Sequence, residues 1–339
     1  MYIIYILNLI IIIIFIIFII TNIYNFNNFT NSSNSNDTIV ISILSTRAGF
    51  YSEFFFTLNH YIAAKKHNYK FKIDSNNWQF KYDKGWLDYF NNINDTNIND
   101  NTNINDNTKT IIVGHSQIIN NYNLIEYTNA IKEIYKYNDH LLLNIINKKK
   151  ELNLYDNIKY DSIFIRRGDK LSEESNYITE KKYLDFLLEK NPNCNIIFLQ
   201  TDDYNCFIEL QKLLDEIKST IRLITLCDKN NFGTIIDINQ KNILKTTKKN
   251  SQYLTYEYKN KMLNNLSVEE MTPEQKYTHT NDMLIGIDIV LNSDMCILDY
   301  QSNVGRFIKL AHKTPENVFS IDNHIINYDS ILCPAYAFE

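Results

Sequence analysis

Two adjacent arginines follow a short apolar run of the sequence. Ile163–Ile165 is β-branched and aromatic, as in a buried parallel strand, and Gly168 soon allows a sharp turn. Arg166 and Arg167 stand between the two, and guanidinium groups can donate paired hydrogen bonds to a phosphate. Because open α/β sheets bind ligands at the carboxyl ends of their strands, this turn is a candidate anion site. An ordinary surface loop of ion pairs would explain the same residues.

Polar residues also follow two later apolar runs. Thr201-Asp202-Asp203 comes soon after the expected strand Ile196–Leu199, and Asp299–Asn303 follows the expected strand Met295–Leu298. Because parallel strands end at the same edge of a sheet, the three loops should converge. The two aspartates before Tyr204 would equally cap a helix that starts there.

The segment Ile163–Leu184 resembles, without a gap, the donor-binding segment of the α-1,6-fucosyltransferase and protein O-fucosyltransferase superfamily. Two further segments, Ile196–Asp203 and Asn292–Arg306, are similar to later blocks of the family and stand in the family's order. The likeness covers roughly residues 160 to 322, with a weak echo at Arg47–Tyr51. It implies a GT-B-like α/β fold, in which two Rossmann-like domains face a cleft.

The resemblance implies a metal-independent, inverting glycosyltransferase that takes fucose from GDP-fucose. Its partners would be this nucleotide-sugar donor and a glycan or glycoprotein acceptor, and it would need no cofactor. Arg166 would then be a catalytic residue that neutralises the leaving diphosphate, and Glu174 would be the general base for the acceptor hydroxyl. The neighbouring Glu173 is one residue away and stays open for the same role.

The resemblance also implies a set of donor-binding residues. Arg167 and Lys170 would hold the diphosphate. Asp202 and Asp203 would orient the nucleotide half, and Ser302 would cap a phosphate together with backbone amides at a helix start. The full set expected at the donor is Gly49, Arg167, Asp169, Lys170, Thr201, Asp202, Asp203, Asp282, Asp288, Ser302 and Asn303.

Two positions depart from the family's pattern. Phe164 stands where the family's strand often has a histidine, which removes a hydrogen-bonding group from the expected pocket. The aspartate that reads the nucleobase in the family falls on Gly286, with Asp282 one helical turn earlier and Asp288 two residues later. Both aspartates stay candidates. A related transferase with another nucleotide sugar, or a non-catalytic glycan-binding or structural membrane protein, stays an alternative.

Length and composition restrict the folds and functions that the sequence allows. A chain of 339 residues favours two domains, and a hydrophobic content of 45% is ample for folding. A net charge of −5 argues against general nucleic-acid binding, which needs a basic face. The five cysteines include no C-x-x-C pair and predict no zinc site, while their disulfide pairing stays open. We expect no divalent metal, because three basic residues already offset the diphosphate.

The chain begins with an apolar segment. Residues 3–20 carry no charge and are just long enough to cross a bilayer, and no signal-peptide cleavage site is evident. They predict a transmembrane signal anchor over residues 1–21, followed by a flexible Asn- and Ser-rich stem over residues 22–38. The protein would then be a single-pass type II membrane protein of the secretory pathway, with its body in the lumen of the endoplasmic reticulum or Golgi.

The body is expected to divide near residue 150. Residues 39–150 would form an N-terminal α/β domain on the acceptor side, with a low-complexity loop over residues 91–109. Residues 151–339 would form the C-terminal domain that binds the nucleotide sugar.

The hydrophobic pattern predicts three features of this body that can be compared with the structure. One continuous helix is expected over Leu124–Asn147. The polar residues 229–279 are expected to hold no clear element except a short helix at Tyr258–Leu263. A helix over Asn281–Leu291 is expected to follow them.

Overall fold

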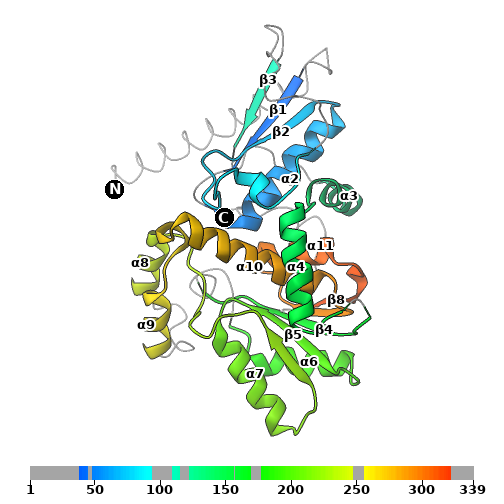
Figure 1. Cartoon of the computed structure of the whole chain (residues 1–339), viewed down its shortest axis with the longest axis vertical. Helices are drawn as coiled ribbons and strands as arrows, with labels where there is room; N and C mark the ends of the chain where they lie inside the picture. The colour runs from blue at the N-terminus through cyan, green and yellow to red at the C-terminus, as the bar shows by residue number, and fades with distance from the viewer. Residues whose placement is uncertain are drawn as a thin grey trace, which may run out of the picture.

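The computed structural model describes residues 38–44, 48–93, 109–114, 122–155, 157–168, 177–246 and 256–321. Strands and helices alternate along much of the chain (Figure 1). In chain order they are β1 Thr38–Ile43, α2 Phe50–Lys66, β2 Lys70–Asp74, η2 Gly85–Asp88, β3 Lys109–Val113, α3 Leu124–Ile134, α4 Asp139–Glu151, β4 Asp161–Ile165, α6 Glu180–Lys190, β5 Ile196–Thr201, α7 Tyr204–Glu216, β6 Arg222–Thr225, α8 Ile238–Thr246, α9 Tyr256–Asn264, η3 Val268–Glu270, α10 Pro273–Leu291, β7 Met295–Leu298, α11 Asn303–Ala311, η4 Pro315–Asn317 and β8 Val318–Ser320.

The described strands form two separate parallel sheets. One has the strand order β2-β1-β3 and the other has the order β6-β5-β4-β7-β8. They lie toward opposite ends of the molecule, and α10 crosses between them (Figure 1). The predicted α/β class with parallel sheets is confirmed. The expected domain division at residue 150 falls inside α4 and stays a prediction.

Strand β4 is the central strand of the larger sheet and is buried along its whole length. Ile163 and Ile165 belong to the core shared with α6 and α7, whereas Phe164 belongs to the core on the opposite face, where α10 lies. This alternation follows from the two-residue period of a strand. The alternation continues past the end of the strand, because Arg166 and Arg167 form ion pairs on opposite faces of the sheet.

The prediction of one helix over Leu124–Asn147 is wrong, because the structure divides this segment into α3 and α4. Asn138 caps α4, since its side chain accepts a hydrogen bond from the Leu141 backbone nitrogen at 2.9 Å. Just before it, Tyr137 pairs with Phe90 in an isolated antiparallel bridge. A distant partner and a capping residue thus replace the helical hydrogen bonds at the break.

The polar stretch 229–279 contains more helix than expected. Helices α8 and α9 and the short η3 lie within it, and α10 begins at Pro273 rather than at Asn281. Thr272 and Gln275 form a capping box at this start, with proline in the first turn. Because α10 leads into β7 and runs against its direction, its additional turns reach the carboxyl edge of the larger sheet.

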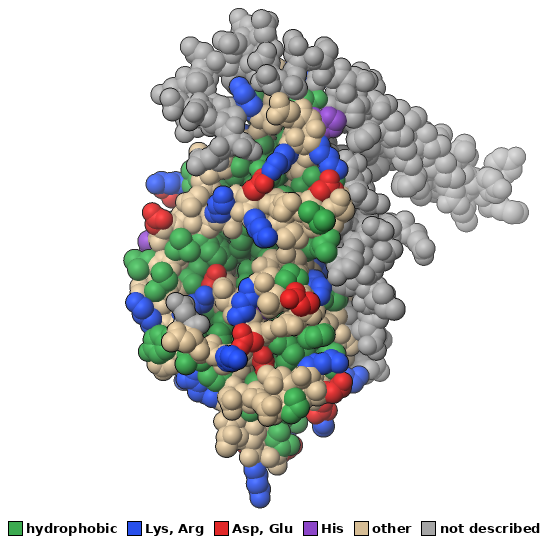
Figure 2. Space-filling model, turned by 90° about the vertical axis from the view of Figure 1, so that its right-hand side faces the viewer, with side chains coloured by type: hydrophobic (Ala, Val, Ile, Leu, Met, Phe, Trp, Pro, Cys, Tyr) green, Lys and Arg blue, Asp and Glu red, His purple; other side chains and the backbone are tan. Residues whose placement is uncertain are grey.

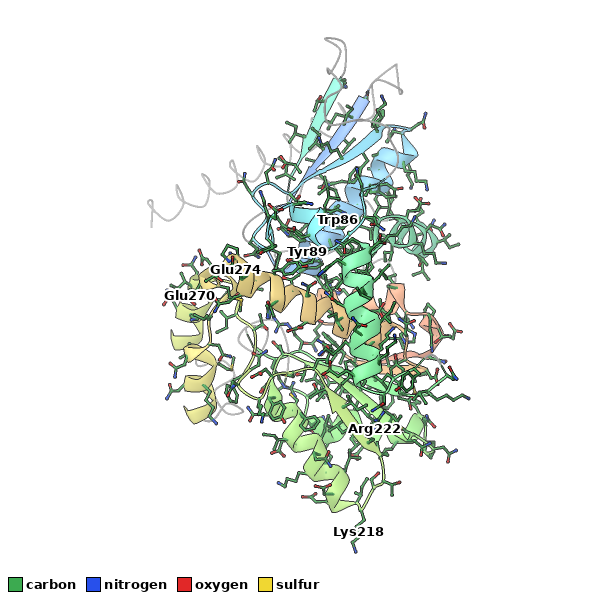
Figure 3. The ribbon with its side chains drawn as sticks, in the orientation of Figure 1. Trp86, Tyr89, Lys218, Arg222, Glu270 and Glu274 are labelled. Carbon is green, nitrogen blue, oxygen red and sulfur yellow. The ribbon has the colours of Figure 1, made fainter. Side chains whose placement is uncertain are left out.

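Aromatic rings fill the space between the two sheets. Phe307 of α11 lies against two rings of α2, with centroid distances of 4.6 Å to Tyr51 and 5.4 Å to Phe54. Tyr89 lies just above α10 in Figure 3, and its ring stacks on that of Tyr277 of α10 at 5.7 Å. The two halves of the body therefore share a packed core.

The described surface carries both signs of charge. On the face shown in Figure 2, Lys and Arg side chains are interspersed with Asp and Glu side chains. No helix of the described ranges is long and apolar enough to cross a membrane. The expected anchor and most of the expected stem lie outside these ranges, as does the greater part of the low-complexity loop.

Four of the cysteines fall within the described chain, and all four are free thiols. Cys194, Cys206 and Cys296 are buried, and Cys227 is partly exposed. The fifth, Cys333, lies outside the described residues. Burial raises the pKa of Cys194 and of Cys296 to about 12, so these thiols stay protonated at neutral pH.

Candidate functional site

Arg166 and Asp202 form an ion pair at the carboxyl edge of the larger sheet. Arg166 directly follows β4, and Asp202 directly follows the neighbouring β5. Asp202 also accepts hydrogen bonds from the backbone nitrogens of Arg167, at 2.7 Å, and of Thr234, at 2.8 Å. The Asp202 carboxylate thus contacts the Arg166 guanidinium and the backbone of two loops at once, which holds the guanidinium in place.

Two glycines allow these loops to approach each other. Gly168 and Gly233 both have positive φ, at 69° and 100°. A Cβ atom on Gly168 would lie 2.7 Å from the Thr234 nitrogen, and one on Gly233 would lie 2.6 Å from the Gly168 Cα atom. The loop around Gly233 therefore packs backbone to backbone against the turn after β4, with the Gly233 nitrogen donating to the Asp202 carbonyl oxygen at 2.7 Å.

Arg167 is buried on the opposite face, with only 2% of its surface exposed. Its guanidinium pairs with Glu180 of α6 at 2.5 Å and donates to the Ile178 carbonyl oxygen at 2.7 Å. It also lies over the Tyr177 ring, 4.4 Å from the centroid. Arg167 thus ties the start of the segment 168–177 to its end. This position favours a supporting role over direct contact with a diphosphate.

Thr201 and Asp203 are buried around the start of α7. Asp203 caps the helix by accepting a hydrogen bond from the Asn205 backbone nitrogen at 2.9 Å. The Asp203 nitrogen in turn donates to the Thr201 hydroxyl at 3.1 Å. These contacts match the helix-capping role that the sequence also allowed.

Ser302 and Asn303 stand at the start of α11, after β7. The Ser302 hydroxyl accepts a hydrogen bond from the Gly305 nitrogen at 3.0 Å, and the Asn303 side chain accepts one from the Arg306 guanidinium at 3.3 Å. Because β7 pairs with β4, the N-terminal turn of α11 lies at the same edge of the sheet as Arg166. The predicted convergence of three loops is therefore observed.

Helix α10 covers the Arg166 face of the sheet. His279 lies near Arg166, and burial together with the arginine's charge lowers the pKa of His279 from 6.5 to about 4, so its imidazole is neutral at pH 7. Asp282 is exposed one turn farther along the helix. Asp288 instead pairs with Lys149 of α4 at 2.5 Å and joins these two helices. Of the two aspartates, Asp282 is thus the one nearer to His279 and the arginine.

Comparison with known proteins finds its matches among solved structures. No protein-family model matches the chain, and no curated protein matches it. A crystal structure of NodZ alpha-1,6-fucosyltransferase soaked with GDP-fucose aligns over 80% of this chain and 92% of that chain, with a TM-score of 0.50 and 10% sequence identity. The chain has a fucosyltransferase-like GT-B fold.

Two further structures align over the same shares of both chains. They are NodZ alpha-1,6-fucosyltransferase co-crystallised with GDP and fucosyltransferase NodZ from Bradyrhizobium, each with a TM-score of 0.47 and 10% identity. The first of the three structures confirms, at the level of the fold, the resemblance seen in the three sequence segments.

Several predicted site residues of this fucosyltransferase-like fold lie outside the described ranges. They are Asp169, Lys170, Glu174 and its alternative Glu173. Gly49 is described and stands immediately before α2, where a Cβ atom would meet nothing within 4 Å. Space therefore does not require glycine at this position. Among the described residues, no three His, Cys, Asp or Glu side chains gather as ligands for a metal ion.

Sequence reasoning missed two residues of the Arg166 face, His279 and Gln200. His279 was placed in a polar stretch without an assigned helix, although Thr272-Pro273-Glu274-Gln275 carries the signature of a helix start. Gln200 of β5 lies against Gly286 of α10. Strand alternation from Phe198 could have placed Gln200 on this face.

Proposed function

We propose that this protein is a glycosyltransferase that moves fucose from GDP-fucose to a hydroxyl group of a glycan or glycoprotein. The observation that carries the proposal is the Arg166–Asp202 pair at the carboxyl edge of a parallel sheet, where such sheets bind their ligands. The pair stands in a fold shared with a fucosyltransferase whose crystals were soaked with GDP-fucose.

The proposed reaction is an inverting displacement of GDP from the anomeric carbon. As the bond between this carbon and the diphosphate oxygen breaks, negative charge grows on the leaving oxygen, and Arg166 offsets it. A carboxylate takes the proton of the acceptor hydroxyl as its oxygen forms the new bond on the opposite side of the sugar. We assign this proton to Glu174, with Glu173 as the alternative.

The test is calorimetry with a panel of nucleoside diphosphates, followed by an assay for GDP release from GDP-fucose. The proposal expects GDP to bind and GDP-fucose to be consumed when an acceptor is present. Binding of another nucleotide in place of GDP would support a transferase with a different donor. Phe164 and Gly286 favour that alternative, because each stands where the family has a polar side chain in the donor pocket. Binding of none would support a non-catalytic protein.

Transfer is expected to need no divalent metal. Arg166 supplies positive charge at the sheet edge, and Lys170 is predicted to add to it, so the diphosphate can leave without a cation. Dialysis against EDTA should leave the rate of GDP release within about twofold of the untreated rate. A loss of turnover that manganese restores would contradict this.

We further propose that residues 3–20 anchor the protein in a membrane of the secretory pathway, with the body in the lumen. The uncharged apolar run carries this proposal. The chain should stay in the membrane pellet after alkaline extraction, and sealed microsomes should protect its body from added protease. Release of the full chain by alkaline buffer would overturn the anchor, and digestion in sealed microsomes would overturn the orientation.

A further inference from the structure

Gln200, near the carboxyl end of β5, presents an unused carboxamide. It is partly exposed, whereas Phe198, two residues earlier on the same face, is fully buried. Within the described chain, the Gln200 side chain makes no hydrogen bond. Neither amide atom is among the buried polar atoms of the described chain that lack a partner, so the carboxamide keeps access to solvent. The group is therefore available to a ligand at the end of the sheet.

Gly286 of α10 makes room for this carboxamide. A Cβ atom on Gly286 would overlap the end of the Gln200 side chain and lie 2.9 Å from its Nε2 atom. The neighbouring positions of the helix are the large residues Ile285 and Ile287, both buried. Gly286 is thus the point where the amide lies directly against the helix backbone.

The carboxamide shares its face of the sheet with Arg166. Gln200 pairs with Phe164 of β4 in the strand register, and Arg166 follows Phe164 by two residues, a rise of about 7 Å along a strand. On the facing helix, His279 precedes Gly286 by seven residues, or two turns, and lies near Arg166. The strand register and the helical spacing therefore both place the Gln200 carboxamide and Arg166 along one line on this face of the sheet.

We propose that Gln200 recognises the base of the nucleotide donor while Arg166 binds its diphosphate. This inference rests on the proposed function and adds the residue that selects the base. A carboxamide is both donor and acceptor. On guanine, its Nε2 donates to O6 and its Oε1 accepts from N1–H, so the 2-amino group is not used.

This pairing predicts that the protein hardly distinguishes GDP from inosine diphosphate. Hypoxanthine offers the same O6 and N1–H but lacks the 2-amino group, so inosine diphosphate should bind almost as well as GDP. A carboxylate reader would behave differently, because it accepts from N1–H and from the 2-amino group together and would reject inosine diphosphate. The ratio of the two affinities therefore reports which side chain reads the base.

The experiment is calorimetry of the full chain with GDP and with inosine diphosphate. The two dissociation constants of the wild type should agree within about threefold. Gln200→Leu should raise both dissociation constants by about tenfold or more, which is the scale of a lost bidentate base contact. Gln200→Glu should favour GDP over inosine diphosphate, because it installs a carboxylate at the same place.

Gly286→Ala gives an independent test without touching Gln200. Its methyl group should push the carboxamide away and weaken the binding of both nucleotides, while alanine preserves the helix. Gln211→Leu is the matched control, since this glutamine lies on α7 and donates to Asp215 at 2.9 Å. Its affinities should equal those of the wild type. Should Gln200→Leu fail to fold, Gln200→Glu and Gly286→Ala carry the test.

Three outcomes would overturn the inference. The first is a wild type that binds GDP but rejects inosine diphosphate by tenfold or more. The second is a Gln200→Leu variant that binds GDP like the wild type, and loss of GDP binding in Asp282→Asn would then assign the base to that aspartate. The third is a wild type that binds neither nucleotide, which would end the proposed function as well. In the first two outcomes the proposed function would stand.

Discussion

Arg166 and Glu174 are expected to act at different stages, so their variants should fail differently. Arg166→Ala removes a charge that contacts both the bound diphosphate and the leaving group, and should weaken GDP binding and slow transfer. Glu174→Gln keeps size and hydrogen bonding but loses the base. It should keep GDP affinity and lower turnover by roughly 10²–10⁴-fold. Calorimetry and initial rates on both variants separate the two effects.

Glu173→Gln is the matched control for the base. It should turn over like the wild type, and the reverse pattern would shift the assignment by one residue. If both glutamine variants stay active, the base lies elsewhere, and Arg47–Glu53 in the N-terminal half is the next segment to test.

At the scale of single residues, the sequence predicted the position of Arg166 in the fold better than the contacts of the residues around it. Strand alternation and the following glycine placed Arg166 at a sheet edge, and the structure agrees. Arg167 is different, because its partner Glu180 lies 13 residues farther along the chain and no sequence pattern predicts that ion pair. Asp202 is held by the nitrogen of Thr234, and such a contact between separate loops leaves no trace in the local sequence.

At the scale of elements, the Arg167–Glu180 pair joins the turn after β4 to α6 in a buried setting. Arg167→Met leaves the Glu180 carboxylate buried without its partner and should destabilise the fold by about 3–5 kcal/mol. The double variant Arg167→Met/Glu180→Met removes both charges and should recover most of that loss. Urea unfolding of the two single variants and the double variant measures the recovery.

The same double variant tests whether Arg167 touches the donor. If the arginine only joins the turn after β4 to α6, GDP affinity should stay within a few-fold of the wild type once stability is restored. A stable double variant that no longer binds GDP would instead show that Arg167 contacts the diphosphate.

Elements with a strong apolar period were predictable, and those fixed by caps or distant partners were not. Strands β4, β5 and β7 stand where the apolar runs indicated, because burial on both faces leaves a continuous apolar signal in the sequence. The break between α3 and α4 depends on Tyr137 pairing with Phe90, which lies far away in the sequence. The capping box at Thr272 could have predicted the early start of α10, but the first turns of this helix are polar and show no apolar period.

At the scale of the whole molecule, three short segments were enough to predict the fold, because they mark the edge where three strands of one sheet end. They could not predict how the halves meet. That contact is made by rings such as Tyr51 and Phe307, which come from opposite ends of the described chain and share no local pattern. The packing of the two halves is therefore a property of the folded molecule.

Global stability should fall as the pH drops below about 6.5, and His312 should cause part of the fall. This histidine is buried, its Nδ1 accepts a hydrogen bond from the Thr314 nitrogen at 3.1 Å, and its Nε2 lies 3.2 Å from the Ser293 hydroxyl. Burial lowers the pKa of His312 from 6.5 to about 4. Between these values the unfolded chain binds a proton that the folded chain does not, so its contribution is full above pH 6.5 and is lost toward pH 4.

Urea unfolding at pH 7 and pH 5 measures this effect, because His312 should remove about 2 kcal/mol of unfolding free energy between the two. Carboxylates and His279 add to the acid dependence of the wild type, so the informative quantity is a difference between proteins. His312→Gln cannot titrate, and its loss of stability from pH 7 to pH 5 should be smaller by that amount. Equal losses in the two proteins would mean that burial does not lower the pKa of His312 in the folded protein.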